Sequence, residues 1–193
     1  MKIKNFKKIS FTDKEPKTLF LDRDGVINVS PKELYVKSWE EFKFEYGVLG
    51  ALKIFNNYFD YIIVVTNQRG VGKNLMTVES LIDIHINMCF EVLAHGGRID
   101  QVYYCTDLDY NSVNLKPNSG MAYKAKLDYK DISFKNSLMI GDSLSDIEFG
   151  KRLDMKTILI CNDEPQCSNP NEIFDVYCKN LLEVVNHLDL SDK

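Results

Sequence analysis

One stretch near the start of the chain decides the fold: Thr18-Leu19-Phe20-Leu21-Asp22-Arg23-Asp24-Gly25-Val26-Ile27-Asn28. The apolar run at 18–21 predicts a short buried strand of a parallel sheet, and ligands collect where such strands end. Asp22 and Asp24 follow directly, and two like charges at the mouth of an apolar strand resist desolvation. A hard divalent cation such as Mg²⁺, which prefers oxygen ligands, would compensate them. Gly25 allows a sharp backbone turn or the close approach of a ligand.

Two other interpretations apply to this stretch taken alone. The two aspartates are equally consistent with an ordinary strand end whose carboxylates are solvated, because Asp is common in loops. An EF-hand calcium loop also begins with two aspartates at this spacing, but it needs glycine at its sixth position. That position holds Ile27, which excludes the calcium loop.

The length and composition predict a single domain that spans residues 1–193. The net charge of −4 argues against a protein that binds nucleic acid, since such modules carry a basic excess. No apolar run approaches the length of about 20 residues that a membrane span needs, and no signal peptide is recognisable. We therefore expect a cytoplasmic protein with no membrane partner; the sequence does not predict its oligomeric state.

Short apolar runs alternate with amphipathic segments along the chain. The predicted strands are 18–21, 61–65, 99–105, 137–140 and 157–160, and the predicted helices are 46–57, 77–93, 122–127, 147–153 and 181–188. This alternation predicts an α/β fold, a doubly wound three-layer α/β/α sandwich with a mostly parallel central sheet. Around it we expect an N-terminal extension (1–16), a small aromatic flap (29–45) and a C-terminal tail that ends in a helix (162–193).

Polar clusters follow most of the predicted strands. Because right-handed crossovers bring the carboxyl ends of parallel strands to one edge, these clusters are expected to converge there. Carboxylates can hold Mg²⁺, whereas a hydroxyl, an amide and a lysine can hold a phosphate, and a carboxylate can attack phosphorus. The residues concerned are Asp22, Asp24, Thr66, Asn67, Lys116, Asp142 and Asp146.

These motifs, in this order, resemble those of the haloacid dehalogenase-like (HAD) phosphohydrolases. The motifs are Asp22-x-Asp24-Gly25, a strand ending in Thr66, Lys116, and Gly141-Asp142-x-x-x-Asp146. Within that superfamily, the stretch 22–28, Thr66-Asn67-Gln68-x-Gly70 and Lys116-Pro117 resemble the subgroup of the heptose-bisphosphate and histidinol-phosphate phosphatases. The resemblance implies a Rossmann-like core and a Mg²⁺-dependent phosphomonoesterase that acts on a small phosphate ester.

The resemblance also implies roles for individual residues. Asp22 would be the nucleophile and a Mg²⁺ ligand. Asp24 would be the general acid and base, and would ligate Mg²⁺ through its backbone carbonyl. Thr66, Asn67 and Lys116 would bind the phosphoryl group. Asp142 would be a further Mg²⁺ ligand, with Asp146 and Gly25 in supporting positions.

Three departures from the subgroup pattern bear on the metal content and the substrate. Cys105 keeps only one ligand of a zinc loop that needs four, so we predict no structural Zn²⁺. Leu115 and Ser143 stand where heptose-bisphosphate enzymes typically carry Arg and Lys, which weakens the case for a bisphosphate. The segments 29–45 and 74–115 leave no room for a separate cap domain.

The segment Gly70-Val71-Gly72-Lys73 matches part of the P-loop motif. The full motif needs glycine at position 67 and serine or threonine at position 74, where this chain has Asn67 and Asn74. We therefore expect the segment to form a turn that shapes the phosphate pocket.

Several alternatives stay open at this point. A phosphate-accepting signalling module of similar fold, or a non-catalytic binding protein, would also carry such acidic residues. Arg69 and Lys73 are as consistent with solvated side chains as with contacts to substrate. Structural or surface roles are expected for the three histidines, His85, His95 and His187, because no metal-ligand pattern surrounds them.

Overall fold

The computed structural model describes residues 8–30, 35–162 and 173–190. Parts of the expected N-terminal extension (1–16), flap (29–45) and tail (162–193) lie outside these residues. Within them, six parallel strands form one sheet in the order β3-β2-β1-β4-β5-β6. The strands are β1 (Thr18–Leu21), β2 (Tyr61–Asn67), β3 (Gln101–Cys105), β4 (Ser137–Gly141), β5 (Lys156–Ile160) and β6 (Val176–Cys178).

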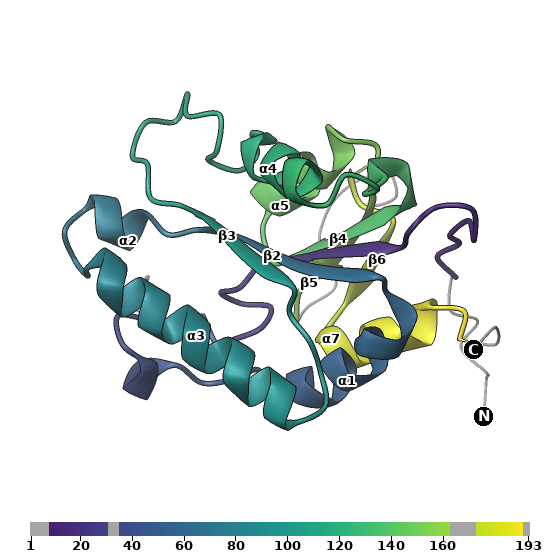
Figure 1. The fold of residues 1–193 in the computed structure, drawn as a ribbon, viewed down its shortest axis with the longest axis horizontal. Coiled ribbons are helices and arrows are strands. Elements are labelled where there is room, and N and C mark those ends of the chain that lie inside the picture. Colours follow the sequence, from purple (N-terminus) through teal and green to yellow (C-terminus); the bar gives the residue numbers. More distant parts are fainter. Residues whose placement is uncertain (1–7, 31–34, 163–172, 191–193) are drawn as a thin grey trace.

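Helices cover both faces of the sheet (Figure 1). On one face lie α1 (Val48–Tyr58), α3 (Val78–Ala94) and α7 (Leu181–Val184); on the other lie α4 (Gly120–Asp128) and α5 (Leu144–Lys151). The short helix α2 (Arg69–Gly72) follows β2, and 3₁₀ turns occur at Trp39–Glu41, Phe134–Asn136 and Val185–His187. The predicted doubly wound α/β fold is confirmed.

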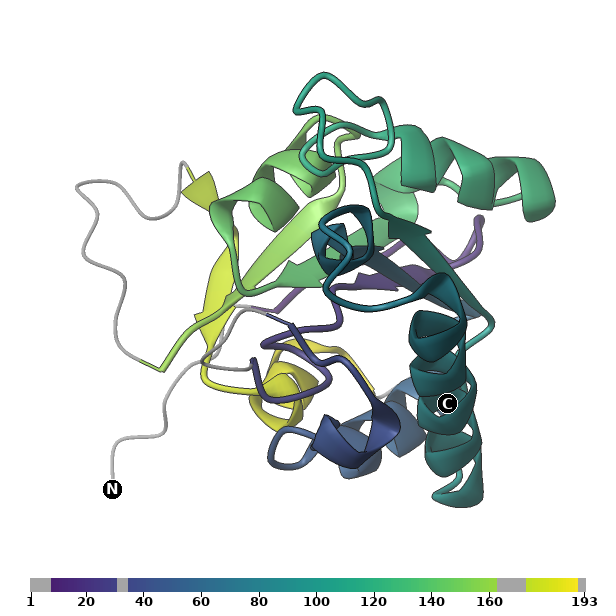
Figure 2. The same cartoon turned by 90° about the vertical axis from the view of Figure 1, so that its left-hand side faces the viewer.

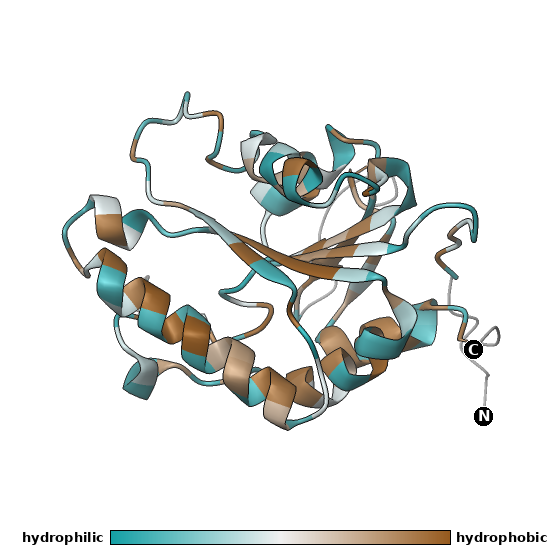
Figure 3. Cartoon of the chain, viewed as in Figure 1, coloured by the Kyte–Doolittle hydropathy of each residue, from teal (hydrophilic) through white to brown (hydrophobic). Residues whose placement is uncertain are grey.

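The core lies in two apolar layers, one on each side of the sheet. Alternate residues of the central strands point to opposite faces, as strand geometry requires. Leu19 and Leu21 pack toward α1 and α3, whereas Phe20 packs toward α4 and α5. The central strands are accordingly apolar along most of their length, and α3 also carries apolar residues at exposed positions (Figure 3).

The structure differs from the sequence prediction at three elements. The helix predicted at 181–188 is the short helix α7 followed by a 3₁₀ turn at Val185–His187. The sequence does not predict strand β6, because a run of three residues carries too little periodic signal. Helix α2 stands where the sequence predicts a turn, since Gly70 and Gly72 disfavour helix. The aromatic packing expected in the flap is present in its described part, where Trp39 stacks on Phe42 with ring centroids 5.0 Å apart.

All six strands of this sheet run in the same direction, so their carboxyl ends share one edge. Figure 2 shows the molecule from the side on which α2 and the loops that follow the strands face the viewer. Strand β1 lies between β2 and β4. The loop after β1 therefore lies between the loops that follow β2 and β4, and polar residues on these three loops can meet.

Replacing Phe20 by alanine tests the packing that holds β1 in place. Phe20 is fully buried and contacts the rings of Phe134 and Phe149. We expect Phe20→Ala to lower the free energy of unfolding by about 3–5 kcal/mol, measured by urea denaturation. Tyr46→Ala is the control, because Tyr46 is 77% exposed and its replacement should change stability by less than about 0.5 kcal/mol. Equal effects of the two substitutions would contradict this assignment of the core.

Candidate active site

The structure brings the predicted polar residues together at the carboxyl edge of the sheet. Asp22 follows β1, Thr66 and Asn67 end β2, Lys116 precedes α4, and Asp142 follows β4. Together with Asp24 and Asp146 they line a pocket of about 180 Å³. Three serines also line it: Ser30, Ser143 and Ser145.

Lys116 is a buried cation in this pocket. Its Nζ donates to Asp22 Oδ1 at 2.8 Å and to the backbone oxygen of Val65 at 2.7 Å, and it lies 2.6 Å from Asp146 Oδ1. Burial opposes its charged form, but the Asp146 and Asp22 carboxylates raise the pKa of Lys116 above its ordinary value. Lys116 therefore stays charged and partly neutralises both carboxylates.

Asn67 positions Lys116 through the backbone. Its Oδ1 accepts from the Lys116 backbone N–H at 3.0 Å, and its Nδ2 donates to the Lys116 carbonyl at 3.2 Å. This pairing joins the end of β2 to the loop before α4. Asn67 lines the pocket as the sequence predicts, but its amide is used on the protein's own backbone.

Three carboxylates form a group of suitable size for a metal ion. One ligand oxygen from each of Asp22, Asp142 and Asp146 lies within 4.8 Å of the others. Asp146 already contacts Lys116, and its Oδ2 accepts from the Ser143 hydroxyl at 2.6 Å. Asp22 and Asp142 are thus the better candidates for direct ligands, and hard carboxylate oxygens suit Mg²⁺.

Burial and charge crowding act on Asp22, the predicted nucleophile. Desolvation of its carboxyl and the nearby Asp146 charge raise the pKa of Asp22 above its ordinary value, and Lys116 opposes this shift. A cation placed between Asp22 and Asp142 would favour the ionised form. The acidic pocket is therefore better suited to hold a divalent ion than to stay uncompensated.

Gly25 lets the loop after β1 approach the loop after β4. Its φ of +81° lies in the left-handed region, which glycine adopts without strain. A Cβ at this position would collide with the Asp142 carboxylate. No larger residue fits there without displacing Asp142.

The Asp24 carboxylate is held by three neighbours. Arg23 Nη2 donates to both of its oxygens at 2.8 and 2.9 Å. Asn28 Nδ2 donates to Oδ1 at 2.9 Å, and Gln68 Nε2 donates to Oδ2 at 2.7 Å. Burial alone would raise the pKa of Asp24, but the charge and hydrogen bonds of Arg23 and the hydrogen bonds of the other two donors lower it.

Sequence reasoning assigns no place in the site to Arg23, Gln68 or His85. Arg23 is completely buried, and its Nη1 lies 3.2 Å from His85 Nε2. A signal for Arg23 is present in the sequence, since a cation stands between two aspartates in the decisive stretch. No comparable signal marks His85, which lies 62 residues further along the chain.

Arg69 and Lys73 are not among the described residues that line the small pocket. Arg69 donates to the Leu108 carbonyl and to the Tyr110 hydroxyl, both at 3.1 Å, and its guanidinium lies over the Tyr110 ring. Lys73 lies over the ring of Tyr35, 5.5 Å from its centre. In this structure both cations are engaged by aromatic rings.

Comparisons with known proteins support one family. The HAD-hydrolase-like family model matches residues 114–183. A D-glycero-alpha-D-manno-heptose-1,7-bisphosphate 7-phosphatase of Campylobacter jejuni is 34% identical over 91% of this chain and 98% of its own length. A D-glycero-beta-D-manno-heptose-1,7-bisphosphate 7-phosphatase of Helicobacter pylori is 29% identical over 88% of this chain and 95% of its own.

A solved structure agrees with these relatives. The D,D-heptose 1,7-bisphosphate phosphatase of B. bronchiseptica, complexed with magnesium and phosphate, aligns with a TM-score of 0.75 and 26% identity. The alignment covers 88% of this chain and 96% of that one. The fold and the site thus define a hydrolase with a doubly wound α/β core. The chain belongs to the HAD-like phosphatases, which are phosphoric monoester hydrolases. No helix in the described residues is long and apolar enough to cross a membrane.

The buried His85 predicts how stability depends on pH. Burial, and then the Arg23 charge, lower the pKa of His85 from 6.5 to about 3. Between these values the unfolded chain binds a proton that the folded protein excludes, so stability is lost as the pH falls below 6.5. When the pH is lowered from about 7.5 to about 5.5, the free energy of unfolding of the wild type should fall by roughly 1–1.5 kcal/mol more than that of His85→Gln. Urea denaturation at each pH measures this difference. If the free energies of unfolding of the two proteins changed in parallel with pH, His85 could not be a neutral, buried residue.

Proposed function

We propose that this protein is a Mg²⁺-dependent phosphatase that hydrolyses a sugar phosphate through an aspartyl-phosphate at Asp22. One observation carries the proposal: the Asp22 carboxylate contacts the Lys116 ammonium at 2.8 Å and forms one group with the carboxylates of Asp142 and Asp146. Lys116 together with a bound cation would keep the nucleophile ionised and would tolerate a second anion beside it.

Asp22, Asp142 and the backbone carbonyl of Asp24 would hold Mg²⁺. When bound, Mg²⁺ offsets the repulsion between the nucleophile and the phosphate. Asp146 supports the site by pairing with Lys116 and Ser143. Thr66 Oγ1 accepts from Gln68 Nε2 at 2.9 Å, so its own hydrogen can point to a phosphoryl oxygen. Lys116 supplies the positive charge beside it.

The reaction proceeds in two steps. An Asp22 oxygen attacks phosphorus, the bond from phosphorus to the leaving oxygen breaks, and Asp24 gives its proton to the leaving alcohol. A water molecule then attacks the aspartyl-phosphate, Asp24 takes its proton, and inorganic phosphate leaves Asp22. The approach of the anionic phosphoryl group raises the pKa of Asp24, which favours the protonated form in the first step.

Replacing Asp22 by asparagine tests the nucleophile. Because the amide cannot form the acyl phosphate, Asp22→Asn should abolish phosphate release while the protein stays folded. Release would be measured with 4-nitrophenyl phosphate, histidinol phosphate and both anomers of heptose 1,7-bisphosphate, with and without Mg²⁺. Full activity of Asp22→Asn would exclude Asp22 as nucleophile, and equal turnover without Mg²⁺ would exclude the metal requirement.

A second pocket has room for the rest of the substrate. It measures about 420 Å³ and shares Ser30 and Asp142 with the catalytic pocket. Lys179, which follows β6, and Glu45 also line it. A carboxylate can accept hydrogen bonds from sugar hydroxyls, and a lysine can pair with a second phosphate. This supports a bisphosphate sugar despite Leu115 and the serine at position 143.

Replacing Lys179 by glutamine tests this placement. Lys179→Gln should raise KM for heptose 1,7-bisphosphate about tenfold, since a charged hydrogen bond contributes roughly 1.5 kcal/mol. KM for 4-nitrophenyl phosphate, which has no second phosphate, should not change. Lys124→Gln is the control, because Lys124 is an exposed lysine of α4 that lines neither pocket. An equal change of KM for both substrates would contradict the role of Lys179.

A further inference from the structure

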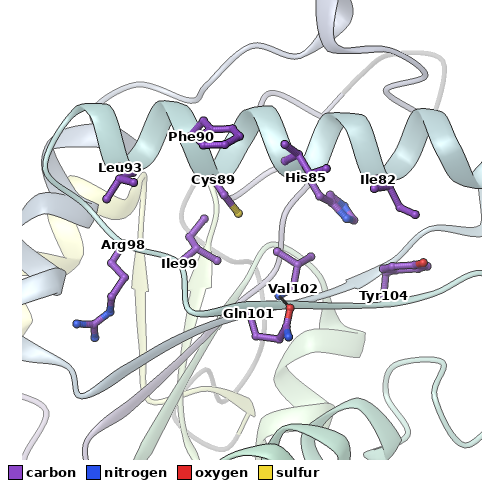
Figure 4. Close-up of a pocket in the computed structure, with 11 residues that line it drawn as sticks. Ile82, His85, Cys89, Phe90, Leu93, Arg98, Ile99, Gln101, Val102 and Tyr104 are labelled. Atoms are coloured by element: carbon purple, nitrogen blue, oxygen red, sulfur yellow. Dashed lines mark hydrogen bonds between the residues drawn. The ribbon is translucent and has the colours of Figure 1, made fainter.

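His85 lies in an apolar setting on α3, facing β3. Its side chain is 7% exposed, and its ring lies beside Tyr104 with centroids 5.7 Å apart. Figure 4 shows the ring projecting from the helix toward the strand. The ring lines a groove of about 500 Å³. Most of its neighbours there are apolar, such as Ile82 and Val102. An imidazole in such surroundings needs a specific partner.

That partner is the guanidinium of Arg23. Arginine only donates hydrogen bonds, so His85 Nε2, 3.2 Å from Arg23 Nη1, must accept and therefore carries no proton. The neutral ring then has its hydrogen on Nδ1. Arg23 is completely buried, and its other terminal nitrogen binds both oxygens of Asp24.

We propose that His85 is a positioning residue for Asp24, because it fixes the Arg23 guanidinium that binds the Asp24 carboxylate. The inference rests on the proposed function, in which Asp24 transfers the proton to the leaving alcohol. Asn28 and Gln68 each bind one Asp24 oxygen, whereas Arg23 binds both. Arg23 is the charged donor of the three and the one that bridges both oxygens, and its second terminal nitrogen lies against His85.

The effect should appear in proton transfer rather than in phosphate binding. Proton transfer to a leaving group contributes about 10²–10⁴-fold, and it depends on the position of the acid. A leaving group that is already a stable anion needs this proton less. Phenol is a weaker acid than 4-nitrophenol, so hydrolysis of phenyl phosphate depends more on Asp24 than hydrolysis of 4-nitrophenyl phosphate does.

The experiment compares kcat/KM for these two substrates in the wild type and three variants. His85→Leu removes the acceptor, His85→Asn has an amide too short to reach Arg23, and His85→Gln places an acceptor near the position of Nε2. We expect His85→Leu and His85→Asn to lower kcat/KM for phenyl phosphate about tenfold to hundredfold, and for 4-nitrophenyl phosphate clearly less. His85→Gln should restore most of the loss.

Cys89→Ala is the matched control, because Cys89 lines the same groove one turn along α3. If His85→Leu does not fold, the comparison of His85→Asn with His85→Gln tests the positioning role by itself. Equal losses for both substrates, or equal behaviour of the Asn and Gln variants, would overturn the positioning role. A wild-type protein that releases phosphate neither from these two substrates nor from heptose 1,7-bisphosphate would instead overturn the proposed function.

Discussion

The contact of the Lys116 ammonium with two buried carboxylates is the interaction on which the rest of the site depends. Without a cation between them, the carboxylates of Asp22 and Asp146 would repel each other in a poorly hydrated pocket. Burying these charges is costly, and removing one partner of such a group leaves the others uncompensated. The position of Lys116 in turn depends on β2, through Asn67 and the Val65 carbonyl.

Much of the fold could be predicted because its strands are continuous β-branched or apolar runs, as at 61–65. Such runs signal burial on both faces, and their alternation with helices indicates a parallel sheet. The three residues of β6 and the glycine-containing α2 could not be predicted, since neither has a periodic pattern of sufficient length. Strand β6 is defined by its pairing with β5 rather than by a pattern of its own.

In the candidate site, too, some residues could be predicted from the sequence and others could not. Polar residues directly after strands, such as Asp22, Thr66 and Asp142, could be placed because topology brings strand ends together. The pairing of Arg23 with His85 could not, because it joins side chains from a loop and from the middle of a helix. The sequence reveals that a cation stands between two aspartates; only the tertiary structure shows that it points inward and which groups hold it.

The tight contact at Gly25 has a mechanical consequence. Because no space remains for a methyl group between this residue and the Asp142 side chain, the loops after β1 and β4 constrain each other. The backbone of the loop after β1 therefore limits where the Asp142 side chain can lie. A side chain at position 25 would have to displace Asp142, so this one glycine sets how closely the two loops can approach each other.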